Sequence, residues 1–269
     1  MTRIDDLCPP AAPLVGGDHD LGPRQTWRSR GVDDWLLMYT YGGACRIAHP
    51  GGELVSGPGE AVLISPHTPH DYGSATGASR WAVLWAVFQP RPAWLEWLIW
   101  PDISPGIGLL TLPEGNLRDG FSERLRSCID LAESACANRD LLAMNALEGA
   151  LLWCREATSR LGRSDIDTRL KRAVDHTVAH LHRNLSLDDL AAVAGLSRPH
   201  LARLFRRHLG MSPQRFHERQ RLERVRQLLR ATTLPLADIA ERTGFCSAFH
   251  CSARFRQQYN TSPRAYRAS

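Results

Sequence analysis

Two stretches in the C-terminal third decide the fold. Residues 187–216 read LDDLAAVAGLSRPHLARLFRRHLGMSPQRF, and residues 236–266 read LADIAERTGFCSAFHCSARFRQQYNTSPRAY. The second stretch repeats the first, and the recurring positions in it are Leu236, Ile239, Gly244, Phe245, Phe255, Ser262, Pro263 and Tyr266. Each copy has the pattern of a short helix, a glycine turn, a second helix and a Ser-Pro start to a third. The sequence therefore predicts a tandem helix-turn-helix domain.

The first copy carries the signals that begin and end helices. Ser186 and Asp189 have the S-x-x-D spacing of a helix N-cap. Gly195 supplies the positive φ that a tight turn between two helices requires. Ser197 caps the second helix, and the first turn of that helix tolerates Pro199. The second copy follows the same frame.

Charge is divided unevenly along the chain. The segment from Thr168 onward holds 19 Lys and Arg against 7 Asp and Glu, a balance of +12, and the remainder has a balance of −7. This division predicts a polyanionic partner for one domain only. Exposed Arg and His on the second helix of each copy suit the major groove of double-stranded DNA. The predicted DNA-binding residues are Arg198, Pro199, His200, Arg203, Arg207, Ser247, His250 and Arg254.

Residues 213–229, between the copies, are predicted to form one long helix. The side chains expected to be buried there are Phe216, Val225, Leu228 and Leu229, and those expected in solvent are Arg215, Arg219, Arg221, Arg224 and Arg226. A rigid connector of this kind would present the two reading helices to successive major grooves on one face of DNA, roughly 34 Å apart.

The N-terminal two-thirds predicts a β-rich domain followed by helices. From Trp35 to Phe88, short apolar runs alternate with Gly and Pro turns, the pattern of a small antiparallel barrel or sandwich. Further on, Gly and Pro nearly vanish and apolar residues recur at helical spacing. We expect a first domain at 1–161, with a barrel at about 15–105 and helices at about 120–161, then a linker at 162–168 and a second domain at 169–269.

Neither a membrane span nor an export signal is expected. The longest apolar stretches fall short of the roughly 18–20 residues of a spanning helix. Residues 1–14 lack the basic start and apolar run of a secretory signal. The seven cysteines are scattered and without CxxC spacing, which fits neither a disulfide scaffold nor a zinc ribbon. We expect buried thiols in a reducing compartment and a cytoplasmic protein.

The doubled C-terminal pattern resembles the DNA-binding domain of the AraC/XylS family of transcription regulators. The residues that carry the resemblance are Gly244, Phe245, Phe255, Tyr259, Ser262 and Pro263. One departure is His250-Cys251, where the family commonly has an aromatic pair. Residues 58–73, 91–101 and 141–148 extend the resemblance to the sensor barrel and dimerisation helix of arabinose-responsive members. It implies a cupin-like β-barrel or jelly roll with dimerisation helices, joined to an all-α tandem helix-turn-helix domain.

The resemblance also implies a function. The implied protein is a homodimeric, ligand-responsive and sequence-specific transcription regulator of sugar metabolism, with RNA polymerase as a further partner. Its effector would be a sugar of the arabinose-like pentose class. Dimerisation would use helices near residues 121–135 and 141–152. The implied dimerisation residues are Leu141, Leu142, Asn145 and Leu151.

Four residues are implied at the ligand site. Trp85 would stack on the sugar ring, Arg28 would donate to its oxygens, and Tyr72 would complete the polar rim. Val83 departs from the family, because arabinose-responsive members have a pocket His there. A lost hydrogen-bond partner of this kind weakens sugar binding by about 1–3 kcal/mol. A different sugar or a non-sugar ligand therefore stays open, and residues 1–14 are a hypothetical latch over the pocket.

Two alternatives are weighed on the residues themselves. A metal-dependent cupin enzyme needs several His and a carboxylate around one ion. Here His67 and His70 are expected in a Pro-rich turn or rim, and the segment from Tyr39 to Gly57 offers only His49. No metal, cofactor or enzymatic activity is therefore expected. The second alternative, a barrel that dimerises without binding a small molecule, stays open.

Overall fold

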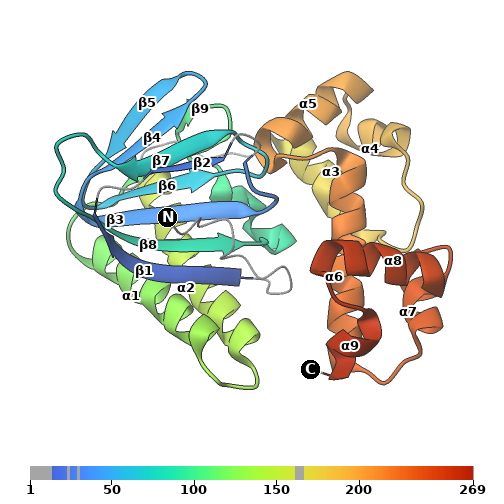
Figure 1. Ribbon diagram of the computed structural model, residues 1–269. Helices are drawn as coiled ribbons and strands as arrows, with labels where there is room; N and C mark the ends of the chain where they lie inside the picture. The colour runs from blue at the N-terminus through green and yellow to red at the C-terminus, as the bar shows by residue number, and fades with distance from the viewer. Residues whose placement is uncertain (1–13, 23–24, 29–30, 161–166, 269) are drawn as a thin grey trace. The chain divides into compact units, whose positions relative to one another are not determined.

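The computed structural model describes residues 14–22, 25–28, 31–160 and 167–268. The chain divides into two compact units. Within these described residues, the first contains ten strands, the 3-10 helix η2 and helices α1 and α2, and the second contains helices α3–α9 (Figure 1). The predicted fold class, a β-rich first domain and an all-helical second domain, is confirmed. The latch of residues 1–14 and the linker of residues 162–168 lie almost wholly outside the described residues, so both stay hypotheses.

Two antiparallel sheets form the first unit, in the orders β1-β8-β3-β6-β10-β9 and β2-β7-β4-β5. The strands of the larger sheet are β1 (Leu14–Leu21), β3 (Trp35–Gly43), β6 (Glu60–Ile64), β8 (Trp81–Phe88), β9 (Asp102–Ser104) and β10 (Ile107–Thr111). Those of the smaller sheet are β2 (Gln25–Arg28), β4 (Cys45–His49), β5 (Gly52–Ser56) and β7 (His70–Ser74). Because the chain passes repeatedly between the sheets, β1 pairs with β8 although they are far apart in sequence.

An apolar core fills the space between the two sheets. Its members come from both sheets, for example Met38 and Val83 from the larger and Ile47 from the smaller. The opposite face of the larger sheet is buried too, so β3 begins with six consecutive buried residues. Burial on both faces explains why its sequence is a continuous apolar run rather than an alternation.

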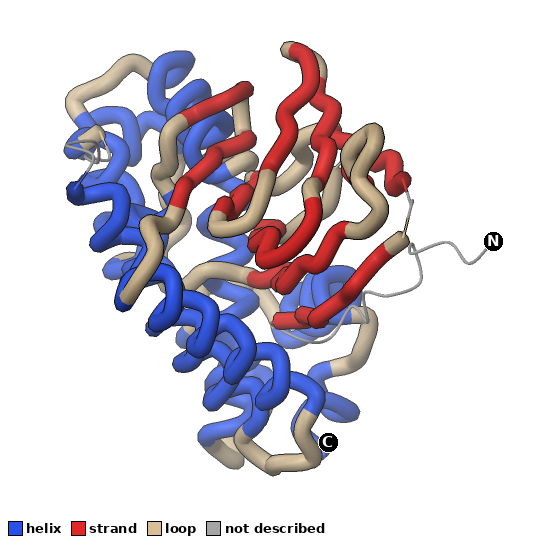
Figure 2. Tube along the Cα trace, turned by 90° about the vertical axis from the view of Figure 1, so that its left-hand side faces the viewer, coloured by secondary structure: helices blue, strands red, loops and turns tan. Residues whose placement is uncertain are grey.

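Helices α1 (Asn116–Glu133) and α2 (Arg139–Arg160) form a hairpin that covers the outer face of the larger sheet (Figures 1 and 2). The ring of Phe121 meets that of Tyr39 edge-on at 5.0 Å between centroids. At Gly16 on β1, a Cβ atom would approach the Ile129 side chain to 3.0 Å, so glycine lets α1 lie close to the sheet. Trp94, in η2 (Pro92–Leu98) beside α2, is fully buried.

The second unit consists of α3 (Thr168–Ala179), α4 (Leu187–Ala194), α5 (Arg198–Leu209), α6 (Pro213–Ala231), α7 (Leu236–Arg242), α8 (Ala248–Tyr259) and α9 (Pro263–Ala268). The predicted tandem is confirmed, with α4–α5 and α7–α8 as the two helix-turn-helix pairs. Ser186 and Asp189 form a reciprocal capping box, and Gly195 and Gly244 take φ values of 66° and 79° at the two turns. No described helix is long and apolar enough to cross a membrane.

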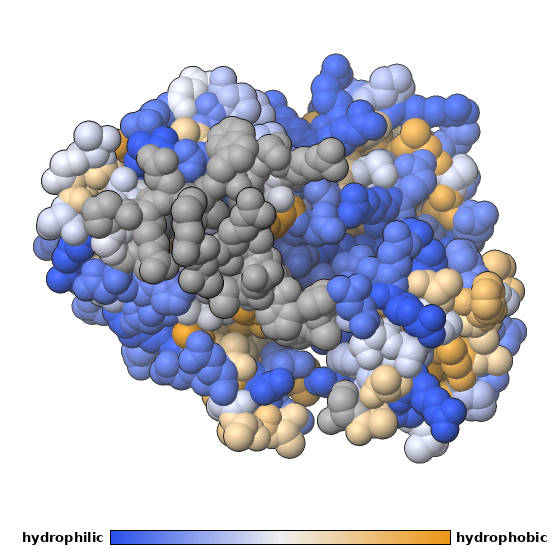
Figure 3. Space-filling model, viewed as in Figure 1, coloured by the Kyte–Doolittle hydropathy of each residue, from blue (hydrophilic) through white to orange (hydrophobic). Residues whose placement is uncertain are grey.

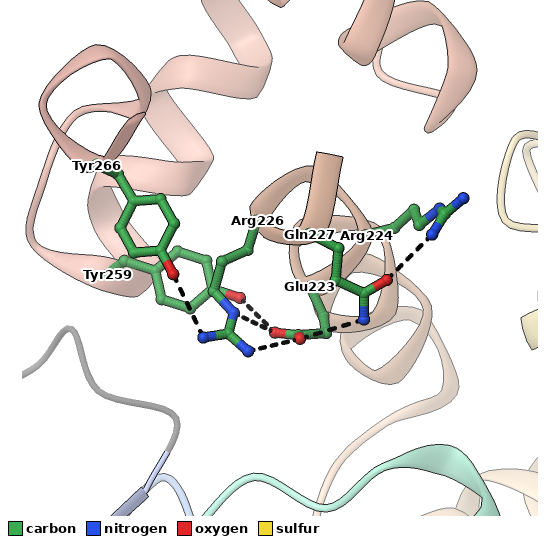
Figure 4. A network of polar contacts seen from close by, with 6 residues as sticks. All are labelled: Glu223, Arg224, Arg226, Gln227, Tyr259 and Tyr266. Carbon is green, nitrogen blue, oxygen red and sulfur yellow. Dashed lines mark hydrogen bonds and ion pairs between the residues drawn. The ribbon is translucent and has the colours of Figure 1, made fainter. Parts of the chain in front are cut away.

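The prediction that Arg226 on α6 is in solvent is wrong. Only 12% of its side chain is exposed, and two of its nitrogens contact the two carboxylate oxygens of Glu223 at 2.8 Å each (Figure 4). The hydroxyls of Tyr266 and Tyr259 complete the network, one near Arg226 and the other near Glu223. Burial acts to lower the pKa of Arg226, but the Glu223 carboxylate outweighs it and raises that pKa. The network ties α6 to α8 and α9, which cover the face expected in solvent.

Candidate nucleic-acid interface and ligand site

Helix α5 buries one face and presents a basic face to solvent. Leu201, Phe205 and Leu209 are buried, and the Phe205 ring meets that of Phe216 edge-on at 5.7 Å. Of the predicted DNA-binding residues on α5, the exposed ones are Arg198, Pro199, Arg203 and Arg207, and His200 is half-buried. The guanidinium of Arg198 forms an ion pair with Asp188 of α4. The outward face of α5 therefore offers Arg203 and Arg207 for a polyanion, with Arg198 fixed beside them.

Helix α8 holds its predicted contact residues differently. Ser247 is the N-cap, and its hydroxyl accepts a hydrogen bond from the backbone N–H of His250 at 3.1 Å. The exposed imidazole of His250 lies 3.2 Å from the Cys246 sulfur. Arg254 is bound by both carboxylate oxygens of Glu218 on α6 at 2.5 Å each, and that carboxylate raises its pKa. Arg254 thus anchors α8 to α6, and 38% of its side chain is exposed.

Arg221 of α6 joins the two helix-turn-helix pairs. Its guanidinium donates to the backbone carbonyls of Leu181 and Arg183, which precede α4, at 2.7 and 2.8 Å. The same group lies 6.0 Å from the centre of the Phe245 ring, which belongs to the second turn. Burial lowers the pKa of Arg221. The prediction that Arg221 is solvated is therefore wrong, because the ends of both copies pack against it.

Trp85 is the point on the inward face of β8 where burial of the side chains becomes incomplete. Along this strand the residues from Trp81 to Leu84 are buried, whereas Trp85 and Val87 are half-buried. The Trp85 indole lies against Gly17 of β1, where a Cβ atom would meet ring atoms at 2.9 to 3.1 Å. Its Nε1–H donates to Nδ1 of His19 at 3.2 Å. Because Trp85 and His19 are both half-buried, an aromatic face and an imidazole lie together at the margin of the core.

Two of the other predicted ligand-site residues belong to the same core, and the third is placed by its strand register alone. Tyr72 packs against it from β7, with its ring 6.0 Å from that of Trp81. Val83 is almost fully buried, two residues from Trp85 on the same face of β8. Arg28 lies on β2 opposite His70 in the strand register. Val83, Trp85 and Tyr72 thus contribute to one core.

The prediction that His70 is a turn or rim residue is wrong. His70 begins β7, is fully buried, and its Nδ1 lies 2.7 Å from the Thr68 carbonyl oxygen. His67 does lie in the turn, with a positive φ of 60°. Among the described residues, no group of three or more His, Cys, Asp or Glu is placed to hold a metal ion.

His19 is the site residue that the sequence did not reveal. It lies opposite Val83 in the register of β1 with β8, and this pairing joins residues 64 positions apart. A single His in a Gly- and Asp-rich stretch carries no signal for such a contact. Only the strand pairing places it beside Trp85.

Helix α2 exposes part of its predicted dimerisation surface. Leu141 and Leu142 are 60% and 44% exposed, and Asn145 is exposed as well. Leu151 is fully buried, so its assignment to a dimer surface is corrected: the side chain belongs to the core of the first unit. Its neighbour Leu152 is 46% exposed and lies on the outward side.

The prediction of buried thiols is only partly right. The buried cysteines are Cys45, Cys128, Cys154 and Cys251, whereas Cys136 and Cys246 are exposed, and Cys8 lies outside the described residues. Burial raises the pKa of the Cys45 and Cys128 thiols to about 12, so both are neutral at ordinary pH. They act as small apolar side chains.

Known proteins resemble the chain in both units. Residues 22–151 match the AraC-like ligand binding domain, and residues 190–269 match a helix-turn-helix domain family. The arabinose operon regulatory protein of Escherichia coli (strain K12) is 31% identical over 242 residues, 90% of this chain and 82% of that protein. Its counterpart from Salmonella typhimurium is 32% identical over 90% of this chain and 86% of that protein. A solved DNA-binding domain of AdpA with its target DNA is 34% identical, covering 37% of this chain and 90% of that one, with a TM-score of 0.36.

A ligand-binding β domain joined to a tandem helix-turn-helix domain defines a ligand-responsive, DNA-binding transcription regulator. The identity to both arabinose operon regulatory proteins extends through the two units rather than through the helical one alone. The chain belongs to the AraC family of transcription regulators.

Proposed function

We propose that this regulator is a homodimer that binds a monosaccharide between the two sheets and in response changes which DNA sites it occupies. The observation that carries the proposal is the half-buried Trp85 indole, which lies over Gly17 and is held by His19. Sugar rings bind to an aromatic face through their C–H side and to hydrogen-bonding groups through their hydroxyls. The names of the two arabinose operon relatives favour a pentose.

Arabinose-responsive members have a pocket His where this chain has Val83, and His19 on the neighbouring strand β1 provides an imidazole instead. Because Nδ1 of His19 accepts the Trp85 N–H, the neutral ring carries its proton on Nε2. That N–H donates to a ligand oxygen from β1, one strand away from the position where arabinose-responsive relatives have their His. Arg28 and Tyr72 retain their proposed roles as donor and rim. The different direction of the imidazole favours a sugar that differs from arabinose at one hydroxyl.

Helix α2 is the proposed dimer surface, through Leu141, Leu142, Asn145 and Leu152. Three leucines that are each more than 40% exposed on one helix make an apolar patch that association with a second copy would cover. The DNA sites that the protein occupies would then depend on both copies of the dimer. RNA polymerase is the further partner that we propose. We propose that the protein acts by binding alone, catalyses no reaction, and works in the cytoplasm with its DNA.

Calorimetry of the full-length protein tests the ligand. The titrants are arabinose, xylose, ribose, glucose and galactose. We expect one of them to bind the unaltered protein, and Trp85→Ala and His19→Ala to lose that binding. Trp97→Ala is the matched control, because Trp97 is half-buried on η2, away from the inward face of β8. If no sugar binds although the protein is folded and binds DNA, the barrel that only dimerises becomes the better reading.

A gel-shift of the promoter beside its own gene, with and without the binding sugar, tests the DNA half of the proposal. Arg203→Ala should weaken binding about tenfold or more, the loss expected for a bidentate base contact. Arg80→Ala is the control, since Arg80 is an exposed arginine of the β domain. Equal affinities of the two variants would contradict the role given to α5.

A further inference from the structure

Phe249 is an exposed aromatic side chain on the second helix-turn-helix pair. It is 85% exposed, more than any other large hydrophobic side chain among the described residues. It is the second residue of α8, two positions after the Ser247 cap. Hydrophobic residues also appear at the surface over α7 and α8 in Figure 3. An exposed Phe is not unusual by itself, so its meaning depends on where the helix places it.

The repeat relates α8 to α5 residue by residue. Ser197 and Ser247 precede the two helices, and Phe205 and Phe255 are their equivalent buried positions. The same 50-residue offset gives three pairs of exposed residues, at positions four residues apart on one helix face. These pairs are Pro199 with Phe249, Arg203 with Ala253, and Arg207 with Gln257.

The two equivalent stripes differ in chemistry. On α5 the stripe carries Arg203 and Arg207, whereas on α8 it carries Phe249, Ala253 and Gln257. Of the two arginines on α8, Arg254 is held by Glu218 at 2.5 Å and by the Gln257 side-chain oxygen at 2.6 Å. The other, Arg256, is exposed and is the equivalent of the exposed Arg206 on α5, so this cation is common to both helices. The stripe of α8 therefore has the larger Phe249 where that of α5 has Pro199, and Ala253 and Gln257 where that of α5 has two guanidinium groups.

We infer that Phe249, with Ala253, contacts the 5-methyl groups of thymine in the major groove, so that the two pairs read different base chemistry. Apolar side chains read thymine through its methyl group, as Arg reads guanine through N7 and O6. The first turn of a reading helix is the part that meets base edges, and the +12 balance of this domain brings it to DNA. The inference rests on the proposed operator recognition. It gives the operator one guanine-dependent and one thymine-dependent element.

Selection from a pool of randomised duplexes, with the full-length protein and with Phe249→Ala and Arg203→Ala, tests the inference. Arg203→Ala should lose a guanine preference in one element, and Phe249→Ala should lose a thymine preference in the other. Deoxyuridine in place of that thymine removes only the methyl group. It should weaken binding about fourfold for the unaltered protein, the value of one buried methyl group, and leave Phe249→Ala unchanged.

Several outcomes decide the question. If Phe249→Ala selects the same sequences with the same affinity, the inference is wrong. If that variant also lowers transcription in a reconstituted assay, Phe249 meets a protein partner instead. A protein that selects no sequence at all contradicts the proposed operator recognition rather than this reading of Phe249. Because Phe249 is almost fully in solvent, the variant should fold, and an unchanged melting temperature checks this.

Discussion

At the scale of single residues, Gly17 controls the proposed sugar platform. A Cβ atom there would lie 2.9 to 3.1 Å from three atoms of the Trp85 indole, closer than van der Waals contact allows. Gly17→Ala should therefore displace the indole and lower sugar affinity at least tenfold, measured by calorimetry. Gly22→Ala is the matched control, because a Cβ at Gly22 meets nothing within 4 Å. Equal affinities in the two variants would show that the indole does not form the platform.

His217 makes the second prediction at this scale. It is 5% exposed on α6, and burial, with Arg221 nearby, lowers its pKa from 6.5 to about 4. Between pH 6.5 and 4 the unfolded chain binds a proton that the folded chain does not. Stability is therefore full above pH 6.5 and falls toward pH 4, by at most about 3 kcal/mol.

Urea unfolding at pH 7.5 and 4.5 measures this loss. His217→Gln should lack that part of the pH dependence, because glutamine does not titrate. His182→Gln, which replaces an exposed histidine, should retain it. Parallel pH profiles for the unaltered protein and His217→Gln would contradict the assignment.

Residue roles were predictable where they act locally. The Ser186–Asp189 cap and the Gly195 turn follow from spacing alone, because a cap and a turn involve neighbours in sequence. His19 and Arg226 were not predictable in this way. The contact of His19 with Trp85 depends on a strand register, and the burial of Arg226 depends on the packing of α8 and α9 over α6. The spacing of apolar residues along the sequence predicts neither a strand register nor the packing of helices that are distant in sequence.

At the scale of secondary-structure elements, α2 makes a prediction about assembly. Leu152→Asp should place a charge in the proposed interface and convert dimer to monomer, measured by sedimentation velocity at micromolar concentration. Leu152 is 46% exposed, so the substitution should leave the fold of the unit intact. Val55→Asp on β5, where Val55 is 56% exposed, is the control and should stay dimeric. If both variants lost the dimer, the assignment of the dimer surface to α2 would be contradicted.

The elements themselves were predicted with uneven success. α7 spans Leu236–Arg242 and is followed by the Gly244 turn, as the repeated frame of the second copy predicts. On α2, apolar residues occur on several faces, so the sequence could not separate Leu151, which is in the core, from Leu152, which is in solvent. A helix that is apolar on both an inner and an outer face gives no single periodic signal. The packing of α1 against it settles which face is inside.

At the scale of the whole molecule, the proposed function depends on holding α5 and α8 together on one DNA. Helix α6 has 19 residues and is therefore about 28 Å long at 1.5 Å per residue, somewhat less than one turn of DNA. Length alone does not fix the orientation of α5 relative to α8. We expect Arg221 to fix that orientation, because its guanidinium donates to carbonyls before α4 and lies against the second turn at Phe245.

Arg221→Met should therefore loosen the geometry of the pair without removing either reading helix. Its affinity for a duplex with one element should match that of the unaltered protein, whereas its affinity for a duplex with both elements should fall about tenfold. Fluorescence anisotropy with the two duplexes, at one fixed salt concentration, measures the difference. Arg224→Met is the control, because Arg224 is exposed on the same helix and its guanidinium donates to the Gln227 side chain of that helix. An equal loss on both duplexes would mean that Arg221 supports the fold or binds phosphate, and that the spacing of the two helices is fixed by other contacts.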